Sequence, residues 1–387
     1  MNHLVIEDKK NCCGCSACYN ICPNDAILMK EDEQGFLYPE VDSEKCVDCG
    51  MCVKICPLQQ ENQAKTPPKI YAVKAKDDEV RFNSSSGGAF TVLSDIVLED
   101  KGIVYGAVFD ENLKVHHIRC DDTQKRNLCR YSKYSQSDMG KIFSEVKKDL
   151  LDGRQVLFTG TPCQVDGLNC FLSGVNTEKL FLVDIICHGV LSPKLFSEFL
   201  KLIEKKRKKK VVGYCYRAKD FGWSDLEKVT FDDGSQEVGT EFLQTWKKIF
   251  YENCDLRPSC YTCKYSTTPR SSDITIGDFW GIEKFSPDFV DTKGVSMVLV
   301  NTDKGKSFFE KAKGHFDIKE QTLEEAKVRN PNLYKSSAPF VSPEAFWNDY
   351  NKYGFYYVVK KYGRYDLKNR TKYLIKRILK KLRIIPS

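Results

Sequence analysis

The chemistry of this chain is indicated first by its cysteines, which number 18 among 387 residues. Residues 1–10 lack the basic and apolar regions of a secretory signal, and no run of about 20 apolar residues could span a bilayer. We therefore expect a cytoplasmic protein. Disulfides are rare in that compartment, so cysteines in such number are better explained as metal ligands or redox groups.

Two groups of four cysteines repeat one spacing, Cys-x2-Cys-x2-Cys-x3-Cys, with Pro23 after the first group and Pro57 after the second. In this pattern three thiolates bind one 4Fe-4S cluster and the fourth reaches the other cluster. Structural zinc sites use paired Cys-x2-4-Cys units, so zinc is the weaker interpretation. The spacing predicts two clusters, one held by Cys12, Cys15, Cys18 and Cys56 and the other by Cys46, Cys49, Cys52 and Cys22.

Residues 1–61 thereby resemble the bacterial two-cluster ferredoxins, including the Cys-Pro-Asn-Asp-Ala-Ile run at residues 22–27. Clusters of this kind transfer single electrons. Cys13 falls outside the repeated spacing, and we expect it to be a bystander.

A further set of cysteines lies at predicted strand ends and loops, where α/β folds keep their sites. Cys163 stands between a strand and a helix, Cys187 ends another strand, and Cys260 and Cys263 form a Cys-x2-Cys pair. These four thiols could converge on a third 4Fe-4S cluster, with Cys254 as the alternative ligand and zinc as the competing metal. The remaining cysteines are expected to be small buried hydrophobic residues, namely Cys120, Cys129, Cys170 and Cys215.

One polar segment directly precedes a predicted helix at residues 89–99 and consists of Ser84, Ser85, Ser86, Gly87 and Gly88. Hydroxyls, glycines and the free N–H groups of a helix N-terminus suit a phosphate or pyrophosphate. Taken alone, an ordinary serine-rich helix cap explains the segment better.

A second polar stretch contains Ser132, Lys133 and Tyr134. A lysine held there could bind a phosphate or polarise a flavin ring, although a solvated loop lysine is the commoner case.

Strand-like runs alternate with helical patterns from about residue 70, which predicts an α/β fold. Hairpins expected around residues 110–113 and 232–235 make the sheet mixed rather than purely parallel. The predicted strands cover residues 103–109, 155–158, 180–186, 273–276 and 295–300, and the predicted helices cover residues 89–99, 138–151 and 193–206.

The net charge of +7 is concentrated in the tail, where residues 360–387 hold 11 lysines and arginines. The pattern there predicts a basic amphipathic helix, which could rest on an anionic membrane face, dock on an acidic partner or pack on its own domain. The rest of the chain is nearly neutral and has no DNA-reading motif, so we expect no nucleic-acid partner.

Six segments in order resemble the coenzyme F-420 hydrogenase/dehydrogenase beta-subunit family over residues 70 to about 330. They are Ser-Ser-Ser-Gly-Gly-Ala-Phe at 84–90, Ser-Lys-Tyr at 132–134, Val-Leu-Phe-Thr-Gly-Thr-Pro-Cys-Gln at 156–164, Cys-His-Gly at 187–189, Arg-Pro-Ser-Cys-Tyr-Thr-Cys at 257–263 and Asp-Ile-Thr-Ile-Gly-Asp-Phe-Trp-Gly at 273–281.

The resemblance implies an iron–sulfur flavoprotein with FAD beside a third 4Fe-4S cluster. It implies that the segment 84–88 binds the FAD phosphates and that Ser132, Lys133 and Tyr134 neighbour the cofactor or substrate, with Lys133 as the catalytic group. It also makes Cys163, Cys187, Cys260 and Cys263 the expected third-cluster ligands.

The expected architecture is a ferredoxin-like domain at residues 1–62, a linker at 63–70, a mixed-sheet α/β flavin and iron–sulfur oxidoreductase domain at 71–330 and a helical extension at 331–387. The predicted function is electron transfer between the clusters and FAD, and on to or from a deazaflavin coenzyme or another organic substrate. The expected partners are a redox protein or soluble carrier and a small-molecule substrate, with peripheral membrane contact through the tail. The alternative is a non-catalytic electron-transfer subunit that serves a partner enzyme.

Overall fold

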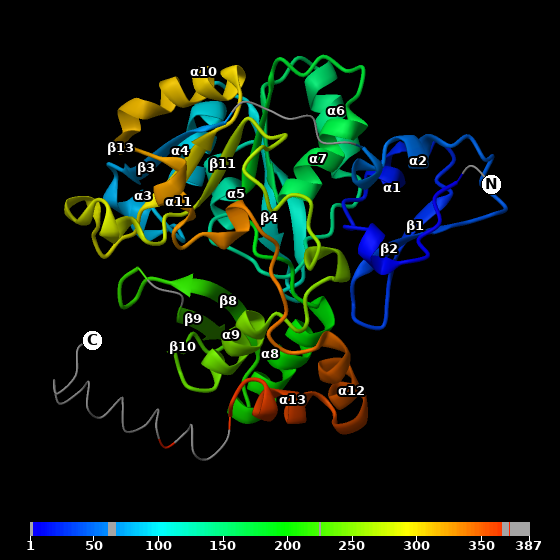
Figure 1. Cartoon of the computed structure of the whole chain (residues 1–387), viewed down its shortest axis with the longest axis vertical. Coiled ribbons are helices and arrows are strands. Elements are labelled where there is room, and N and C mark those ends of the chain that lie inside the picture. Colours follow the sequence, from blue (N-terminus) through cyan, green and yellow to red (C-terminus); the bar gives the residue numbers. More distant parts are fainter. Residues whose placement is uncertain (1–2, 61–66, 224–225, 366–370, 372–387) are drawn as a thin grey trace.

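The computed structural model describes residues 3–60, 67–223, 226–365 and 371 (Figure 1). The strands of these residues form a two-stranded, a three-stranded and an eight-stranded sheet. The predicted basic tail helix lies outside the described residues except for Thr371. In the described part of the chain, none of the helices combines the length and apolar character needed to cross a bilayer.

The N-terminal unit contains both cysteine groups and one hairpin. Its helices, α1 (Ala17–Ile21) and α2 (Met51–Lys54), each follow a residue in the left-handed region, Ser16 at φ 65° and Gly50 at φ 73°. These residues occupy equivalent positions of the two repeats, so the repeated spacing produces a repeated backbone turn. The other elements of the unit are η1 (Lys9–Asn11), β1 (Ile27–Glu31), β2 (Leu37–Val41) and η2 (Pro57–Gln59).

The eight-stranded sheet confirms the predicted mixed α/β fold. Its strand order is β13-β3-β12-β11-β7-β6-β4-β5, with four parallel strands at the centre, β11 to β4, and antiparallel strands toward both edges. The strands are β3 (Lys69–Ala75), β4 (Ile103–Phe109), β5 (Val115–Cys120), β6 (Val156–Gly160), β7 (Leu180–Ile185), β11 (Ile274–Asp278), β12 (Ser296–Val300) and β13 (Phe316–Gln321).

Helices cover both faces of this sheet, as Figure 1 shows. Successive residues of β4 point to opposite faces: Ile103 and Tyr105 pack with α6 (Ile142–Leu151) and α7 (Pro162–Phe171), whereas Val104 packs with α4 (Ala89–Glu99) and α10 (Asp303–Ala312). Because alternate side chains of the strand face opposite sides of the sheet, helices pack on both sides and the domain has three layers. Shorter elements complete it, namely α3 (Asp78–Phe82), α5 (Thr123–Leu128), α11 (Leu323–Lys327), η3 (Pro258–Cys260), η4 (Ile282–Lys284), η5 (Pro287–Phe289), η6 (Lys313–His315) and η7 (Pro331–Leu333).

A second group of elements, the three-stranded sheet and its helices, lies beside the large sheet and has its own hydrophobic core. Trp246 stacks on Phe199 with ring centroids 5.3 Å apart, and Phe346 and Val358 from the C-terminal helices belong to the same buried cluster. Residues beyond 330 thus share a core with residues 191–260. The elements are α8 (Pro193–Arg207), β8 (Val211–Ala218), β9 (Leu226–Phe231), β10 (Gln236–Val238), α9 (Leu243–Glu252), α12 (Pro343–Tyr353) and α13 (Phe355–Lys361).

The predicted elements agree with the structure except at their ends. The hairpins at 110–113 and 232–235 are present as β4–β5 and β9–β10. The helix expected over 138–151 begins only at Ile142, because Asp138 instead pairs with the first residues of β5: its N–H donates to the carbonyl of Val115 and its carbonyl accepts from the N–H of His117. The hydrogen bonds of Asp138 to β5 therefore replace the helical hydrogen bonds that the periodicity predicts for the start of this segment.

Candidate iron–sulfur centres and cofactor site

The thiols of the first predicted cluster lie together in the N-terminal unit. Burial raises the pKa of Cys18, and the neighbouring thiols of Cys12 and Cys56 raise it further. Burial and then Cys12 likewise act to raise the pKa of Cys56, while Cys18 is one of the groups that raise the pKa of Cys15. The structure therefore brings Cys56, from the second group of cysteines, beside Cys12 and Cys18 of the first group. Neutral thiols held at such high pKa values release their protons when a metal binds.

The thiols of the second predicted cluster line one small pocket, which contains Cys22, Cys46, Cys49 and Cys52. The N–H of Ala26 donates to the Cys22 sulfur at 3.3 Å, a contact typical of ligands to iron–sulfur clusters. Cys49 is exposed, so this group lies nearer the surface than the first.

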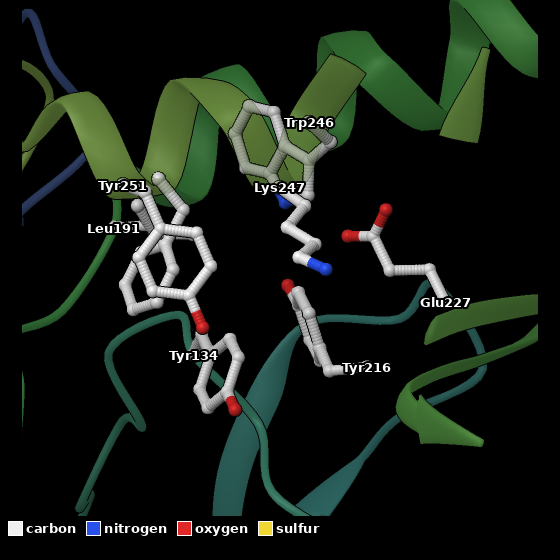
Figure 2. Close-up of a pocket in the computed structure, with 8 residues that line it drawn as sticks. Tyr134, Leu191, Tyr216, Glu227, Trp246, Lys247 and Tyr251 are labelled. Carbon is white, nitrogen blue, oxygen red and sulfur yellow. The ribbon is translucent and has the colours of Figure 1, made fainter. Parts of the chain in front are cut away.

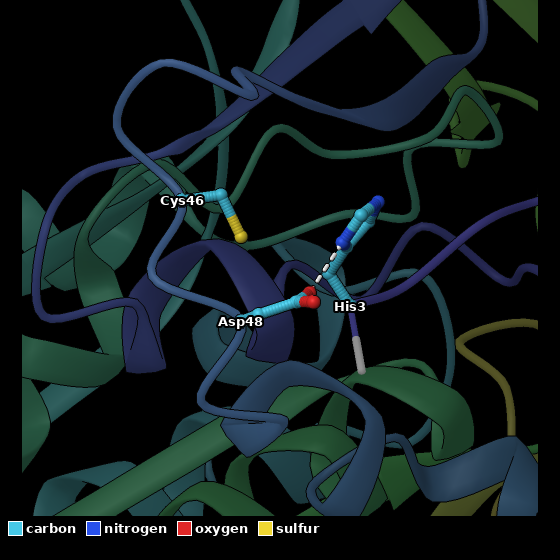
Figure 3. Close-up of side chains that lie close together, drawn as sticks. All are labelled: His3, Cys46 and Asp48. Carbon is cyan, nitrogen blue, oxygen red and sulfur yellow. Dashed lines mark hydrogen bonds and ion pairs between the residues drawn. The ribbon is translucent and has the colours of Figure 1, made fainter. Parts of the chain in front are cut away.

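His3 and Asp48 lie at the rim of this second pocket (Figure 3). The Nδ1 atom of His3 is 2.7 Å from a carboxylate oxygen of Asp48, and the donor atoms of both residues lie within 4.8 Å of the Cys46 thiol. Because Cys46 belongs to the predicted cluster, these two residues are its surroundings rather than a separate site.

The third set of cysteines lines a cavity of about 490 Å³ between the N-terminal unit and the large sheet. Cys163 comes from the start of α7, Cys187 follows β7, and Cys260 and Cys263 lie at and just after η3. Burial and the neighbouring thiols of Cys260, Cys163 and Cys263 raise the pKa of Cys187. The topology thus brings together four thiols from three distant segments of the chain, and their donor chemistry fits a 4Fe-4S cluster.

Cys13 also lines this cavity, although the sequence treats it as a bystander. The thiols of Cys15, of the first group, and Cys163, of the third, are neighbours that act on the pKa of its thiol, so Cys13 lies between the two groups. Cys254, expected as an alternative ligand, is instead fully buried in the aromatic core, where its sulfur lies 4.0 Å from the carbonyl of Ile249. The sequence distinguishes Cys13 only as an additional cysteine outside the repeated spacing.

The cysteines expected in the core are buried to different degrees. Cys120 is fully buried, whereas Cys129, Cys170 and Cys215 are partly exposed. The sulfur atoms of Cys120 and Cys129 lie 3.7 Å apart at the end of β5 and the end of α5.

Gly167 allows the N-terminal unit to approach the large sheet closely. A Cβ atom at this position of α7 would lie 2.8 Å from the sulfur of Cys15. We expect Gly167→Ala to displace that thiol and to lower the iron content of the purified chain by about four per protein. Gly314→Ala is the matched control, since a Cβ there meets open space. Equal iron content in both variants would contradict the prediction.

The two polar segments predicted to hold a flavin meet in the structure. The Ser85 hydroxyl accepts hydrogen bonds from the N–H of Ser132 at 2.9 Å and from its hydroxyl at 3.2 Å. Ser84 and Ser86 face the protein instead, and their hydroxyls each donate to a backbone carbonyl at 2.7 Å, those of Val80 and Val295.

The glycines of this loop serve close packing at the start of α4. A Cβ at Gly87 would lie 2.4 Å from the carbonyl oxygen of Val73 in β3, and Gly88 has φ +92° as the residue preceding the helix. Two arginines beside the loop, Arg81 and Arg130, each have a buried Nε that finds no hydrogen-bond acceptor in the described part of the chain, and the terminal nitrogens of Arg81 pair with Asp291 and Asp78. Hydroxyls, a helix N-terminus and cationic groups together fit an anion such as a pyrophosphate.

Lys133 folds back onto the turn that carries it and is partly buried. Its ammonium donates to the carbonyls of Leu128, Arg130 and Tyr131 at 3.1, 2.8 and 3.2 Å. Burial lowers its pKa to about 8. Its three N–H groups are therefore engaged, and a flavin contact has to replace one of these bonds.

Lys219 is a buried lysine that sequence reasoning missed. Its ammonium donates to the carbonyl of Ser86 at 2.6 Å and to those of Arg81 and Lys293. Burial lowers its pKa to about 7. No motif marks this residue, because its place beside the serine loop arises from the fold.

Tyr134 lines an aromatic pocket (Figure 2). Its ring stacks on Phe250 with centroids 4.8 Å apart and also contacts Tyr216. Trp246, Lys247 and Tyr251 of α9 line the same pocket, whose volume of about 10 Å³ suits a single water molecule. The structure therefore separates Tyr134 from Ser132, its neighbour in the predicted motif.

Comparison with known proteins finds two family matches within the chain. Residues 11–59 match the 4Fe-4S dicluster domain, and residues 153–326 match the C-terminal part of the family "Coenzyme F420 hydrogenase/dehydrogenase, beta subunit". The domain at 153–326 belongs to this family. The resemblance inferred from the sequence is thus confirmed, and the two matches contain all twelve predicted ligands. The segments 84–88 and 132–134 lie outside both matches.

A curated relative is the "F420-dependent formate dehydrogenase 1 subunit beta" of Methanococcus maripaludis, which is 24% identical over 253 residues. The match covers 63% of this chain and 59% of that protein, so the chain spans about three fifths of the relative's length. Among solved structures, the F420-reducing [NiFe] hydrogenase complex of Methanosarcina barkeri is similar at 20% identity and a TM-score of 0.45, covering 67% of this chain and 85% of that one.

Proposed function

We propose that this beta-subunit family member is an iron–sulfur flavoprotein oxidoreductase. It transfers electrons between ferredoxin-type 4Fe-4S clusters and FAD, and on to or from a soluble hydride carrier such as a deazaflavin coenzyme or another organic substrate. The observation that carries the proposal is the convergence of Cys163, Cys187, Cys260 and Cys263 on one cavity that Cys13 joins to the ferredoxin thiols. Clusters supply one-electron chemistry, whereas a flavin couples it to the two-electron reactions of organic substrates.

The proposed roles of the chain's own residues follow from their positions. Three groups of thiols hold the clusters, and the partly exposed group around Cys49 is nearest to a partner protein. Ser85, Ser132 and the N-terminus of α4 bind the FAD phosphates, and the nearby Arg130 supplies positive charge. Lys133 and Lys219 keep the adjoining backbone turns in place around this site. Lys133 is the residue proposed to act on the flavin or substrate.

The flavin assignment is tested by anaerobic purification of the full chain, followed by release of the cofactor and its identification by mass. We expect one FAD together with about twelve irons per chain, as three 4Fe-4S clusters require. Ser85→Ala should weaken FAD retention about tenfold, since a hydrogen bond to a charged group contributes about 1.5–3 kcal/mol. Ser307→Ala, an exposed serine on α10, is the control. Colourless protein without flavin or iron would overturn the proposal.

The second candidate function is a non-catalytic electron-transfer subunit. Two observations favour it: the matched relative is itself a subunit, and the flavin segments lie outside the matched residues. The protein partner is then a dehydrogenase or hydrogenase subunit that carries the substrate site. Reduction of an organic acceptor by the isolated chain, supplied with dithionite, distinguishes the two functions, because a non-catalytic subunit gives no turnover.

A further inference from the structure

We propose that Arg257 is a positioning residue whose permanent positive charge raises the reduction potential of the cluster bound by Cys12, Cys15, Cys18 and Cys56. The inference rests on the proposed function, because it requires that these thiols hold a cluster. It concerns a side chain that neither the cysteine spacing nor the flavin segments involve.

The guanidinium of Arg257 reaches from the second unit into the first group of thiols. Its Nε donates to the carbonyl of Cys12 at 2.9 Å, and its Nη2 lies 3.5 Å from the sulfur of Cys12. Nη2 also donates to the carbonyl of Leu37 at 3.0 Å, and Nη1 donates to the side-chain oxygen of Gln136 at 2.7 Å. These contacts together fix the charge next to a predicted ligand sulfur.

The site is built to enclose this cation. Arg257 is 1% exposed, and its guanidinium lies over the ring of Tyr38 at 4.1 Å from the centroid. Gly14 has φ +68°, and a Cβ there would lie 2.8 Å from Nη1, so the cysteine loop needs glycine at this position to admit the arginine. Gln136, which accepts from Nη1, also holds the cysteine loop by donating to the carbonyl of Cys13 at 3.0 Å.

None of the hydrogen-bond partners of the Arg257 guanidinium among the described residues is a carboxylate. Burial of an unpaired cation is costly, so a natural sequence retains one only where an anionic group compensates it. The groups within reach that become anionic when a metal binds are thiols, since the same side chain lines the cavity of Cys163 and Cys260 and lies against the sulfur of Cys12. A cluster bound to those thiolates supplies the missing negative charge.

The direction of the effect follows from electrostatics. Reduction of a 4Fe-4S cluster adds one electron and makes or breaks no bond, so the cluster and its ligands become more negative by one charge. A fixed cation in a low-dielectric, water-free position stabilises the more negative state. Hydrogen bonds to ligand sulfurs and local charge are the established means by which proteins set cluster potentials. Arg257 supplies both.

The test is a potentiometric titration of the reconstituted full chain, followed by electron paramagnetic resonance, after iron and sulfide have been counted. For Arg257→Gln we expect the equilibrium constant for reduction of one cluster to fall at least tenfold, which corresponds to ~59 mV more negative for a one-electron couple. Arg257→Lys, which keeps the charge, should stay within about threefold of the unmutated chain. Arg126→Gln is the matched control, since Arg126 is similarly buried but pairs with Asp95 on α4 and contacts none of the predicted cluster ligands in the described part of the chain.

Unchanged potentials in Arg257→Gln, or an equal shift in Arg257→Lys, would overturn the inference while leaving the proposed function intact. Absence of iron from the unmutated chain would instead overturn the proposed function. Should Arg257→Gln fail to fold, nuclear coupling measured on the unmutated chain with 15N-labelled arginine decides the question. We expect a 15N coupling to one reduced cluster, and its absence would refute the proposed contact.

Discussion

Replacement of Cys260 by alanine is expected to lower the iron content from about twelve to about eight per chain, because one 4Fe-4S cluster loses a ligand. Cys260 lines the cavity that also contains Cys163, Cys187 and Cys263. The ferredoxin thiols do not depend on it, so their two clusters should remain. Iron and sulfide analysis of anaerobically reconstituted protein measures the loss.

Cys254→Ala is the control for this prediction. Cys254 lies only six residues before Cys260 and has the same chemistry, but it is buried in the aromatic core and does not line the cavity. The iron content of this variant should therefore equal that of the unmutated chain. If Cys254→Ala loses four irons and Cys260→Ala loses none, the assignment of the third group of ligands is wrong.

Replacement of Asp255 by asparagine is expected to remove a large pH dependence of stability. Asp255 is completely buried, and neither carboxylate oxygen has a hydrogen-bond partner on another described residue. Burial raises its pKa to about 8, against a smaller opposing effect of its own backbone N–H. The folded chain therefore keeps this carboxyl protonated at pH 7, whereas the unfolded chain ionises it near pH 3.9.

The sign of the dependence follows from proton linkage. Because the folded state binds one more proton between these two pKa values, the stabilisation is complete below about pH 4 and is lost as the pH rises to about 8. The loss amounts to ~1.4 kcal/mol per pH unit. Urea unfolding of the unmutated chain and of Asp255→Asn, followed anaerobically at pH 5, 6, 7 and 8, measures the difference between them. A constant difference across this range would show that Asp255 is ionised in the folded protein.

Local patterns in the sequence were sufficient for the elements and for the two ferredoxin-type groups. The repeated Cys-x2-Cys-x2-Cys-x3-Cys-Pro spacing predicts its ligands, since a loop this short can wrap around a metal cluster in only a few ways. The strand β4 and the helix α4 have the bounds that alternation and helical periodicity predicted. Hairpins at 110–113 and 232–235 were likewise predictable from their turn residues.

The position of single side chains within motifs was not predictable in this way. Ser132 and Tyr134 are two residues apart, yet Ser132 joins the serine loop while Tyr134 stacks on Phe250 in another core. Lys133 between them binds its own turn. The sequence predicted one site for all three residues because they are neighbours in the chain. In the structure their side chains leave the backbone in different directions and lie in three different places.

By itself, the amino-acid sequence determined the two cluster-binding loops, the mixed α/β architecture and the family of the second domain, because each depends on residues close together in the chain. Only the tertiary structure decided that Cys13 meets Cys163, that Cys254 stays in the core and that Arg257 enters the first thiol group. These contacts join segments more than a hundred residues apart or distinguish near neighbours by the direction of the backbone. Local spacing in the sequence predicts neither the long-range contacts nor the directions of neighbouring side chains, since the tertiary packing determines them.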